Sequence, residues 1–412
     1  MELTKVKLGD YLDDFGDGIH GTPNYDENGE YYFINGNNLD NGAIFIDSET
    51  KRISSDEYES IKRNLNNRTL LLSINGTLGR LAYYNGENIA LGKSACFLNF
   101  KENTDRRYFR YILEMKDFKQ YMFKVASGST IKNFSPRQAA EYEFFAPKIE
   151  DQKKIASVLS ALDDKIALNK KMNQKLEAMA KRLYDYWFVQ FDFPDKNGRP
   201  YKTTGGPMTY NPTLKREIPV GWEVSNICPL MEILPGGTPS KAKPEYWNGD
   251  IPFFGPTDYC GDVYQLSTEE HITEKGLNNC ASALYPPKTI FITARGSVGK
   301  LIVCGKPMAM NQSCYALKPF DLDKYEYLFY LTKQLIEQLK KKGSGSVFKS
   351  INTLDIEQSF MSIAPNEIIE LYCKKVKSIF ERIKSNTVEI AKLTTLRDKL
   401  LPLLMNGQVV VG

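Results

Sequence analysis

Residues 155–187 read IASVLSALDDKIALNKKMNQKLEAMAKRLYDYW, and this stretch decides the fold of the 412-residue chain. Its apolar and amide side chains recur at alternating spacings of four and three residues. These positions are Ile155, Leu159, Leu162, Ile166, Asn169, Asn173, Leu176, Ala180, Leu183 and Trp187. A heptad pattern of this length predicts one long helix whose apolar stripe packs against another helix.

The same pattern returns 217 positions later in the chain. The matching positions are Tyr372, Val376, Ile379, Ile383, Asn386, Ile390, Leu393, Arg397, Leu400 and Leu404. Arg397 interrupts this second stripe, and we expect Leu396 to turn inward in its place. The two stretches predict two helices of roughly 40 residues, about 60 Å long at 1.5 Å per residue.

Asn169 and Asn386 occupy equivalent positions, and each lies near the middle of its helix. A single heptad stretch can also be an ordinary bundle helix, but two matched stretches in one chain favour pairing with each other. If a pseudo-twofold axis relates the helices, only their midpoints meet their own equivalents. We therefore predict an antiparallel coiled coil in which Asn169 faces Asn386, and a hydrogen bond between the two amides fixes the register.

The rest of the chain also contains an internal duplication. The segment SINGTLGRL (73–81) matches TARGSVGKL (293–301), and SGSTIKN (127–133) matches SGSVFKS (344–350). A third pair is IALGKSACFL (89–98) and MAMNQSCYAL (308–317). Short β-rich runs and helical stretches at 106–123 and 324–342 accompany these segments in both copies. The sequence therefore predicts two similar α+β globular domains with twisted β-sheets, joined by the two long helices.

This organisation places the boundaries of six segments. They are a first globular domain (1–147), a first long helix (148–190), a linker (191–221), a second globular domain (222–363), a second long helix (364–407) and a C-terminal tail (408–412). The linker is rich in Pro, Gly and Thr, which predicts turns and not a packed element. We expect the two domains to lie at opposite ends of the helical rod.

The composition is that of a globular protein, with 42% hydrophobic and 25% charged residues. Seven scattered cysteines without a C-x-x-C pair favour a reducing compartment. No run approaches the ~18 apolar residues of a membrane span, and the N-terminus does not resemble a signal peptide. We therefore expect a cytoplasmic protein with no membrane partner. The net charge of +4 does not by itself indicate a nucleic-acid partner.

Motifs for catalysis are missing from the sequence. The chain has only two histidines, His20 and His271, and the triplet GKS at 92–94 lacks the earlier glycine of a phosphate-binding loop. We found no methyl-donor, nuclease or metal motif. The residues therefore offer no candidate catalytic constellation.

Three polar loops recur in both copies and carry the positive signal. They are the Gly-Thr-Pro loops within 16–29 and 235–259, the turns at 73–81 and 293–301, and the SGS loops. Glycine lets the backbone approach a ligand closely, and the hydroxyl, amide and basic side chains suit phosphates and base edges. The candidate DNA-binding residues are His20, Thr22, Asn24, Asn75, Thr77, Arg80, Ser129 and Lys132 in the first copy, and Thr238, Ser240, Lys241, Arg295, Ser297, Lys300, Ser346 and Lys349 in the second.

Over essentially its full length the chain resembles the specificity subunit of type I restriction–modification systems. The segments that carry the resemblance are residues 147–193, from PKIEDQKKIASV to FVQFDF, together with LTTLRDKLLPLLMNGQV (393–409), GGTPSKAKPEYWNGDIPFFGPTDY (236–259) and ITARGSVGKL (292–301).

The resemblance implies a DNA reader whose two target-recognition domains each bind one half of an interrupted double-stranded DNA site. It implies that the paired helices set the spacer and dock two methylation subunits, and that restriction subunits join afterwards. S-adenosylmethionine would then bind the methylation subunits, and ATP the restriction subunits, so the resemblance implies that this chain is non-catalytic and needs no cofactor of its own. The alternative is a coiled-coil scaffold with two duplicated protein-binding domains, which would bind no DNA even beside a methylation subunit.

Overall fold

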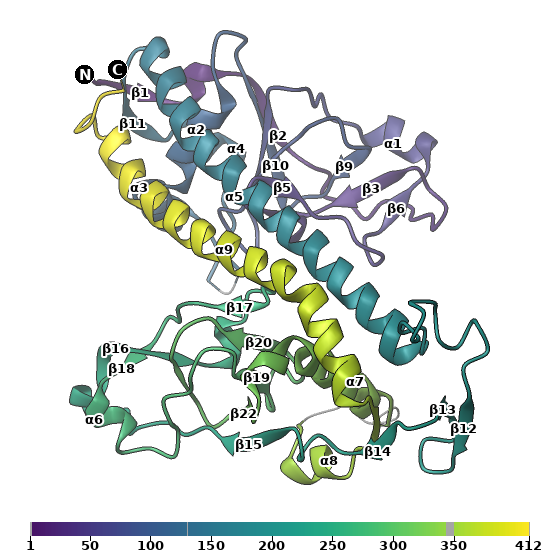
Figure 1. The fold of residues 1–412 in the computed structure, drawn as a ribbon. Helices are drawn as coiled ribbons and strands as arrows, with labels where there is room; N and C mark the ends of the chain where they lie inside the picture. Colours follow the sequence, from purple (N-terminus) through teal and green to yellow (C-terminus); the bar gives the residue numbers. More distant parts are fainter. Residues whose placement is uncertain (1, 130, 343–349, 412) are drawn as a thin grey trace. The chain divides into compact units, whose positions relative to one another are not determined.

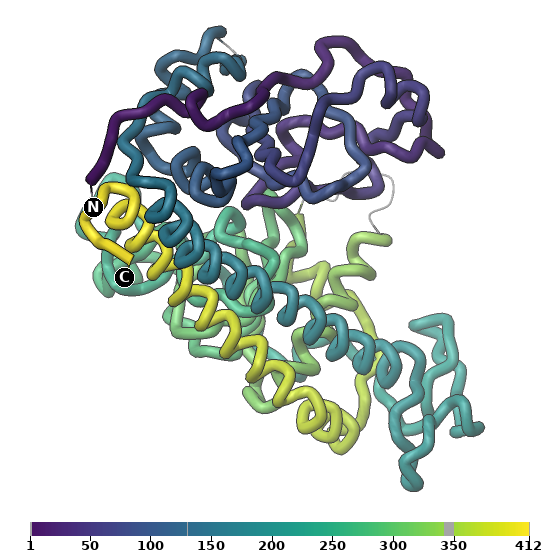
Figure 2. Tube along the Cα trace, turned by 90° about the horizontal axis from the view of Figure 1, so that it is seen from above, coloured from purple at the N-terminus to yellow at the C-terminus, as the bar shows by residue number. Residues whose placement is uncertain are grey.

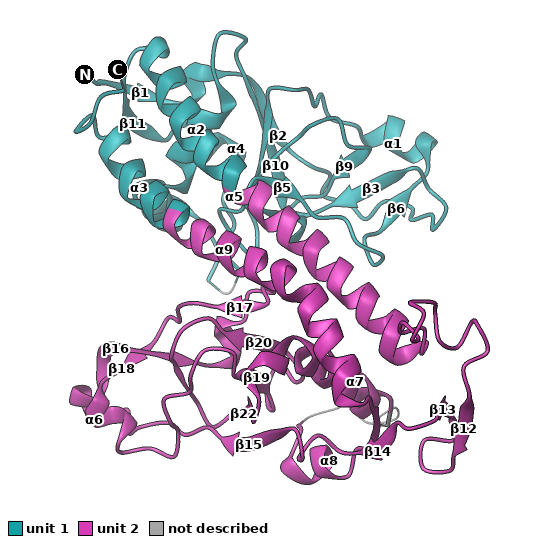
Figure 3. Cartoon of the chain, in the orientation of Figure 1, with its two compact units in different colours: residues 1–165, 393–412 teal, residues 166–392 magenta. Residues whose placement is uncertain are grey.

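The computed structural model describes residues 2–129, 131–342 and 350–411. The chain forms two compact units, residues 1–165 with 393–412 and residues 166–392 (Figure 3). Helices α5 (Ile149–Tyr184) and α9 (Asn366–Met405) are the two long helices (Figure 1). Because the boundary between the units falls inside both helices, each unit contains one globular copy and part of each helix. Among the described residues, no helix combines the length and the apolar character that crossing a bilayer requires.

The globular copy of the first unit is built on a four-stranded antiparallel sheet in the order β2-β10-β7-β8. A second sheet has β3 between β6 and β9, and short pairs join β1 to β11 and β4 to β5. The strands are β1 (Thr4–Lys7), β2 (Leu12–Asp17), β3 (Tyr31–Ile34), β4 (Leu39–Asp40), β5 (Ala43–Ile44), β6 (Arg52–Ile53), β7 (Thr69–Ser73), β8 (Leu81–Tyr83), β9 (Ile89–Leu91), β10 (Ala95–Phe100) and β11 (Glu143–Ala146). The helices before α5 are α1 (Ser55–Ile61), α2 (Arg106–Glu114), α3 (Lys116–Val125) and α4 (Pro136–Ala140).

The globular copy of the second unit repeats this topology. Its main sheet has the order β15-β22-β19-β20-β17, and its second sheet has β16 between β18 and β21. The strands are β14 (Glu223–Ser225), β15 (Met231–Pro235), β16 (Trp247–Phe254), β17 (Tyr264–Gln265), β18 (His271–Ile272), β19 (Ile290–Thr293), β20 (Leu301–Cys304), β21 (Ala309–Met310), β22 (Cys314–Pro319) and β23 (Met361–Ile363). The helices before α9 are α6 (Glu274–Leu277), α7 (Tyr325–Lys342) and α8 (Thr353–Glu357).

Matched local interactions explain why the two copies fold alike. Ser135 caps α4, and its hydroxyl accepts a hydrogen bond from the backbone of Gln138, while Asn352 caps α8 in the same way. Gly29 and Gly249 lie where a Cβ atom would meet a neighbouring strand's backbone at 2.2 and 2.5 Å. The duplication predicted from the sequence is therefore present in the fold.

Both long helices turn their heptad stripe inward. All the heptad positions predicted on α5 and α9 are buried or half-buried. Figure 2 shows the two helices running alongside each other, and their contacts pair the end of one helix with the beginning of the other. In the second unit, the Tyr372 hydroxyl donates to the Ala180 carbonyl at 3.0 Å, and in the first unit Arg397 donates to Asp163 at 2.9 Å. The helices are therefore antiparallel in both units.

The predicted pairing of Asn169 with Asn386 is wrong by one helical turn. Both amides are buried, but Asn386 donates to the Oδ1 atom of Asn173 at 2.9 Å, and Asn169 donates to Glu389 at 2.9 Å. Asn173 also donates to Thr387 at 3.3 Å. The layer of Asn173 and Asn386 lies next to the layer of Asn169 and Glu389. The pseudo-twofold axis that relates the helices therefore passes between two layers and not through a layer of equivalent residues.

The expected inward turn of Leu396 is also wrong. Leu396 is 46% exposed, whereas Arg397 keeps its place on the stripe. The guanidinium group of Arg397 forms an ion pair with the Asp163 carboxylate on the other long helix. The ion pair therefore replaces the apolar contact that the heptad pattern predicts.

The linker is better packed than its composition predicts. Strands β12 (Met208–Asn211) and β13 (Arg216–Pro219) pair as an antiparallel hairpin. Phe191, Phe193 and Ile218 are buried in the core of the second unit. The Asp192 carboxylate also accepts hydrogen bonds from the backbone and the hydroxyl of Thr203, both at 2.7 Å. The buried Phe191 and Phe193 side chains therefore make the linker part of the second unit.

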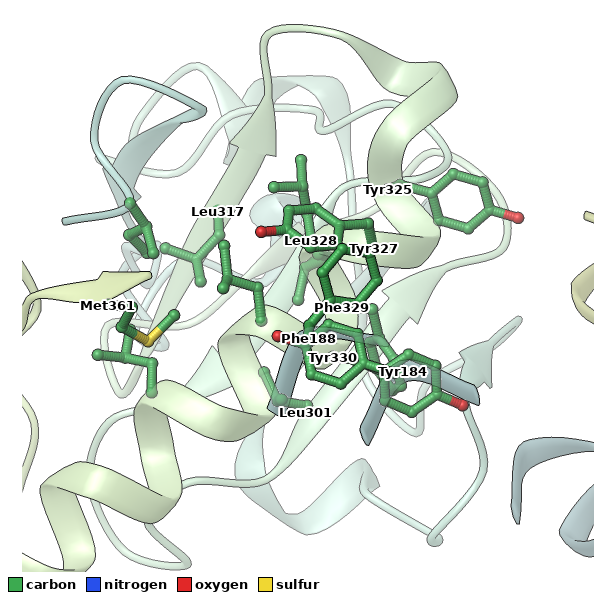
Figure 4. Close-up of a cluster of buried hydrophobic side chains, with 14 of the residues drawn as sticks. Tyr184, Phe188, Leu301, Leu317, Tyr325, Tyr327, Leu328, Phe329, Tyr330 and Met361 are labelled. Carbon is green, nitrogen blue, oxygen red and sulfur yellow. The ribbon is translucent and has the colours of Figure 1, made fainter. Parts of the chain in front are cut away.

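The core of the second unit joins α7 to the end of α5. A π-helical turn (Asp185–Val189) follows α5 directly. The rings of Tyr184 and Phe188 lie against Tyr330 and Tyr327, with centroids 5.5 and 4.8 Å apart (Figure 4). Aromatic pairs at these distances stabilise a core beyond the burial of their area. They attach the second globular copy to its half of the helix pair.

Candidate nucleic-acid interface

The two turns that resemble each other in sequence have the same internal hydrogen bonds. The Ser73 hydroxyl donates to the Thr77 carbonyl at 2.6 Å and accepts from the Arg80 amide at 2.8 Å. The Thr293 hydroxyl donates to the Ser297 carbonyl and accepts from the Lys300 amide in the same way. Both glycines of each turn adopt positive φ, between 72° and 85°. The shared residues are therefore those that form the turn.

The turn of the first copy lies beside its SGS loop, and the turn of the second copy contacts Ser350, the one described residue of the matching segment 344–350. In the first copy, Asn75 forms a β-bridge with Asn133, and the Phe134 amide donates to the Ile74 carbonyl at 2.8 Å. In the second copy, Arg295 forms a β-bridge with Ser350. The structure therefore brings together two of the three loops that the sequence singles out.

The Gly-Thr-Pro loop joins the same group through a connecting loop, residues 92–94 in the first copy and 311–313 in the second. In the first copy, the Ile19 amide donates to Leu91 at 2.9 Å, and the Ile74 amide donates to Ser94 at 2.9 Å. In the second copy, the Gly237 amide donates to the Met310 carbonyl at 3.2 Å, and the Ala294 amide donates to the Ser313 carbonyl at 2.7 Å. All three polar loops therefore converge in the first copy, whereas in the second copy the Gly-Thr-Pro loop and the turn converge with Ser350, the one described residue of segment 344–350. We call each of these groups the loop cluster of its copy.

The connecting loops themselves are part of the loop cluster, although the candidate residues do not include them. The Ser94 hydroxyl accepts a hydrogen bond from Gly36 and donates to the Asn35 side chain, both at 2.9 Å. Lys93 and Gln312 are the exposed side chains of the two connecting loops. The sequence repeat of 89–98 at 308–317 could have identified these loops, because a polar turn that recurs between two buried strands is a candidate for a binding surface.

Most of the candidate residues reach solvent. Asn75, Arg80 and Thr238 are half-buried, and Ser346 and Lys349 lie outside the described residues. The exposed candidates are His20, Thr22, Asn24, Thr77, Ser129, Lys132, Ser240, Lys241, Arg295, Ser297 and Lys300. The clusters therefore present hydroxyl, amide and basic groups on their outer side.

Some candidates already contact other residues of the chain, and these contacts orient them. The partners are Asp17 for His20 at 2.8 Å, Glu57 for the Asn24 side chain at 3.0 Å, Glu270 for Lys241 at 2.8 Å, Gln312 for Thr238 and the Asn37 carbonyl for Arg80 at 3.3 Å. The Arg295 guanidinium makes no hydrogen bond or ion pair with any residue of the described chain. Within the described part of the chain, no residue therefore occupies the donor fork of Arg295.

The described residues contain no group of three or more His, Cys, Asp or Glu side chains that could hold a metal ion. The interface is built from hydrogen-bond donors, acceptors and basic groups. Such groups suit recognition of phosphates and base edges.

Comparison with known families agrees with this architecture. The sequence model described as "Type I restriction modification DNA specificity domain" matches residues 3–178 and 219–395, each containing one globular copy and much of the helix that follows it. The chain therefore belongs to the family of type I restriction–modification specificity subunits. Subunits of this class recognise DNA and are not catalytic, so the chain is a recognition subunit and not an enzyme.

Individual relatives carry the same description. The chain is 29% identical over 364 residues to the type I restriction enzyme HindI specificity subunit of Haemophilus influenzae, covering 76% of both chains. It is 28% identical over 313 residues to the MjaIX specificity subunit of Methanocaldococcus jannaschii, covering 75% of this chain and 70% of that protein. The crystal structure of a type I S subunit from M. genitalium covers 98% of this chain and 96% of its own, with 17% identity and a TM-score of 0.58. This last likeness concerns the fold.

Proposed function

We propose that each loop cluster reads one half of an interrupted double-stranded DNA site. The observation that carries this proposal is the convergence of the three polar loops in the first copy, together with the matched backbone hydrogen bonds that join the Gly-Thr-Pro loop, the connecting loop and the turn in both copies. The two clusters differ at matching positions, for example at the half-buried Asn75 of the first copy and the exposed Arg295 of the second. Two similar frameworks with different side chains would read two different half-sites.

The antiparallel helices would set the distance between the two half-sites and dock two methylation subunits, which restriction subunits then join. Readers on one face of a duplex must lie about one helical turn apart, ~34–36 Å, or a multiple of it. Helices of 36 and 40 residues have the length to hold two readers at such a spacing. In this assembly S-adenosylmethionine and ATP bind the methylation and restriction subunits, and the protein acts in the cytoplasm.

Expression of the chain with its methylation subunit, followed by mapping of the modified adenines across a genome, tests this function. We expect one interrupted motif with a modified adenine in each half. An uninterrupted motif would contradict the division of the site between the two copies. Assembly with the methylation subunit without DNA binding would support the scaffold alternative.

Replacing Arg295 by alanine should relax the specificity at one position of one half-site. Arginine commonly donates two hydrogen bonds to guanine, whereas asparagine, its counterpart at position 75, commonly pairs with adenine. Losing such a contact should cost about 1–3 kcal/mol of discrimination. Binding titrations against duplexes with all four bases at each position of the half-site measure this cost.

Arg295→Lys is the matched control for this substitution, because lysine keeps the charge but cannot form the planar pair of hydrogen bonds. We expect it to lose the base discrimination as the alanine variant does. Recovery of the original specificity by lysine would show that the charge alone carries the discrimination. Equal weakening of all sequences by alanine would mark Arg295 as a phosphate contact.

Removal of one facing heptad from each helix should shorten the unread spacer and leave both half-sites unchanged. Residues 169–175 and 384–390 are suitable, because their removal takes away both sides of the buried polar layers and keeps the three-four spacing of the stripe. Seven residues correspond to about 10 Å of helix, or roughly three base pairs at 3.4 Å each. Mapping of the methylated motif measures the change.

Two further results complete this test. Removal of residues 169–175 alone leaves the partner layer on α9 unmatched, and this variant should lose binding at every spacer length. If the double deletion changes the bases of a half-site but not the spacer, the helices do not set the distance.

A further inference from the structure

The SGS loop of the first copy holds one side chain in an unusual position. Ser127 and Asn133 close the loop with two backbone hydrogen bonds, of 2.9 and 2.8 Å. Gly128 has a φ of +94°, and a Cβ atom there would lie 2.2 Å from the Ile131 carbonyl oxygen. The described ends of the loop are therefore closely paired, and Ile131 lies between them on the exposed side.

Ile131 is apolar and 62% exposed, although its neighbours in the loop are polar. It does not anchor the loop, because Phe134 does so. Phe134 is fully buried, and its ring packs edge-on against Phe118 and Tyr121 at 6.0 and 6.3 Å. The exposed Ile131 side chain is therefore available to an apolar group of a partner.

The surroundings of Ile131 indicate what this partner is. The β-bridge between Asn133 and Asn75 places the loop beside the turn that carries Thr77, and Lys132 is the next residue in the chain. In the second copy, the sequence SGSVFKS has Phe348 at the matching position, outside the described residues. Both copies thus carry a large apolar residue directly before the lysine of this loop.

We propose that Ile131 packs against the C5 methyl group of a thymine in the half-site that the first copy reads. This methyl group is the apolar group that base edges display in the major groove. Isoleucine is stiff at its β-branch, so a short closed turn presents its methyl groups in a set direction. Ile131 then selects thymine by an apolar contact, beside neighbours that form hydrogen bonds. The proposal rests on the proposed function, because it requires that the loop cluster of the first copy contacts DNA.

Replacement of thymine by deoxyuridine removes only this methyl group and tests the contact. The assembled complex with the methylation subunit is titrated with duplexes in which each thymine of the first half-site is replaced in turn. We expect wild-type binding to weaken about fourfold at one position, the equivalent of ~0.8 kcal/mol for one buried methyl group. Ile131→Ala should bind the thymine duplex about fourfold more weakly and should not distinguish thymine from deoxyuridine there.

Phe145→Ala is the control variant, because Phe145 is similarly exposed at 58% but lies on β11, outside the loop cluster. It should keep the sensitivity of the wild type to deoxyuridine. The proposal is overturned if no replacement affects the wild type, or if Ile131→Ala keeps the same sensitivity. It is also overturned if Ile131 instead raises the fluorescence of 2-aminopurine in the half-site, since that result would indicate insertion between base pairs. If the wild-type complex shows no sequence-specific DNA binding at all, the proposed function itself is refuted.

Discussion

Replacing Asp163 by alanine is expected to lower the free energy of unfolding of the first unit by about 3–5 kcal/mol. The Asp163 carboxylate accepts hydrogen bonds from Arg110 at 3.1 Å, from the Tyr111 hydroxyl at 2.7 Å and from Arg397 at 2.9 Å. It therefore joins α2, α5 and α9 in one network. Removal of Asp163 leaves the buried Tyr111 hydroxyl without its acceptor and takes one carboxylate partner from each of the two guanidinium groups. Breaking a buried network by removing one partner costs more than the pair itself contributes.

Burial makes this network sensitive to the loss. The Arg110 side chain is only 8% exposed, and burial alone would lower its pKa. The carboxylates of Glu114 and Asp163 outweigh this effect, so the pKa of Arg110 is raised above its usual value. Without Asp163, the charged guanidinium keeps Glu114 as its carboxylate partner, at 2.8 Å.

Hydrogen exchange in increasing denaturant measures this prediction within one molecule. Amides in 106–125 should exchange faster in the variant, whereas amides of α7 in the second unit should be unchanged. Asp164→Ala is the control, because Asp164 is exposed and lies next in the chain. A change below about 1 kcal/mol in the first unit would show that the network does not hold the helices to the domain.

The second copy attaches to its helices without this network. The position 217 residues after Asp163 is Phe380, whose ring lies 5.7 to 6.2 Å from those of Tyr325, Phe329 and Tyr330 on α7. One attachment is thus ionic and the other aromatic at equivalent places. The duplicated architecture therefore does not depend on one kind of interaction.

Gly237→Ala is expected to disrupt the loop cluster of the second copy, at a cost of about 3 kcal/mol, the upper part of the usual range for overpacking. A Cβ atom at Gly237 would lie 2.5 Å from the backbone nitrogen of Ala281 and 2.8 Å from its Cα atom. Both atoms belong to the main chain, so neither can rotate away as a side chain could. The Gly-Thr-Pro loop would have to move away from the segment that contains Ala281.

Gly21→Ala is a matched control, because Gly21 precedes Thr-Pro in the first copy as Gly237 does in the second. A Cβ atom at Gly21 has no neighbour within 4 Å. Methylome mapping of complexes with each variant should show loss of sequence preference in one half-site for Gly237→Ala and an unchanged motif for Gly21→Ala. Equal effects of both variants would contradict the role assigned to this close approach.

The sequence allowed the long helices and the duplication to be predicted, because both are expressed as local periodicity and as direct repeats. It did not allow the axial register of the helices to be predicted. A heptad pattern defines which side of a helix is buried, but not which turn faces which. Contacts such as Tyr372 with Ala180 set the register, and they place Asn386 opposite Asn173. The error at Leu396 has a similar origin, because the carboxylate that accepts Arg397 belongs to the other helix.

The candidate site was predicted in part for a related reason. The glycines and hydroxyl residues of each loop were visible as repeated letters, since the turns need them locally. The convergence of the loops was not visible, because it depends on backbone bonds between segments far apart, such as Ile74 with Ser94 and Phe134 with Ile74. The buried role of Phe191 and Phe193 in the linker likewise depends on a core formed by distant residues.

The loops of each cluster are tied to one another mainly through peptide groups, and this has a consequence for how the protein diversifies. A substitution of an outward-facing side chain changes a chemical group on the surface without removing any of the backbone hydrogen bonds that hold the loops together. New binding preferences can therefore arise by single amino-acid changes on an unaltered frame. Each half of the molecule can acquire them separately.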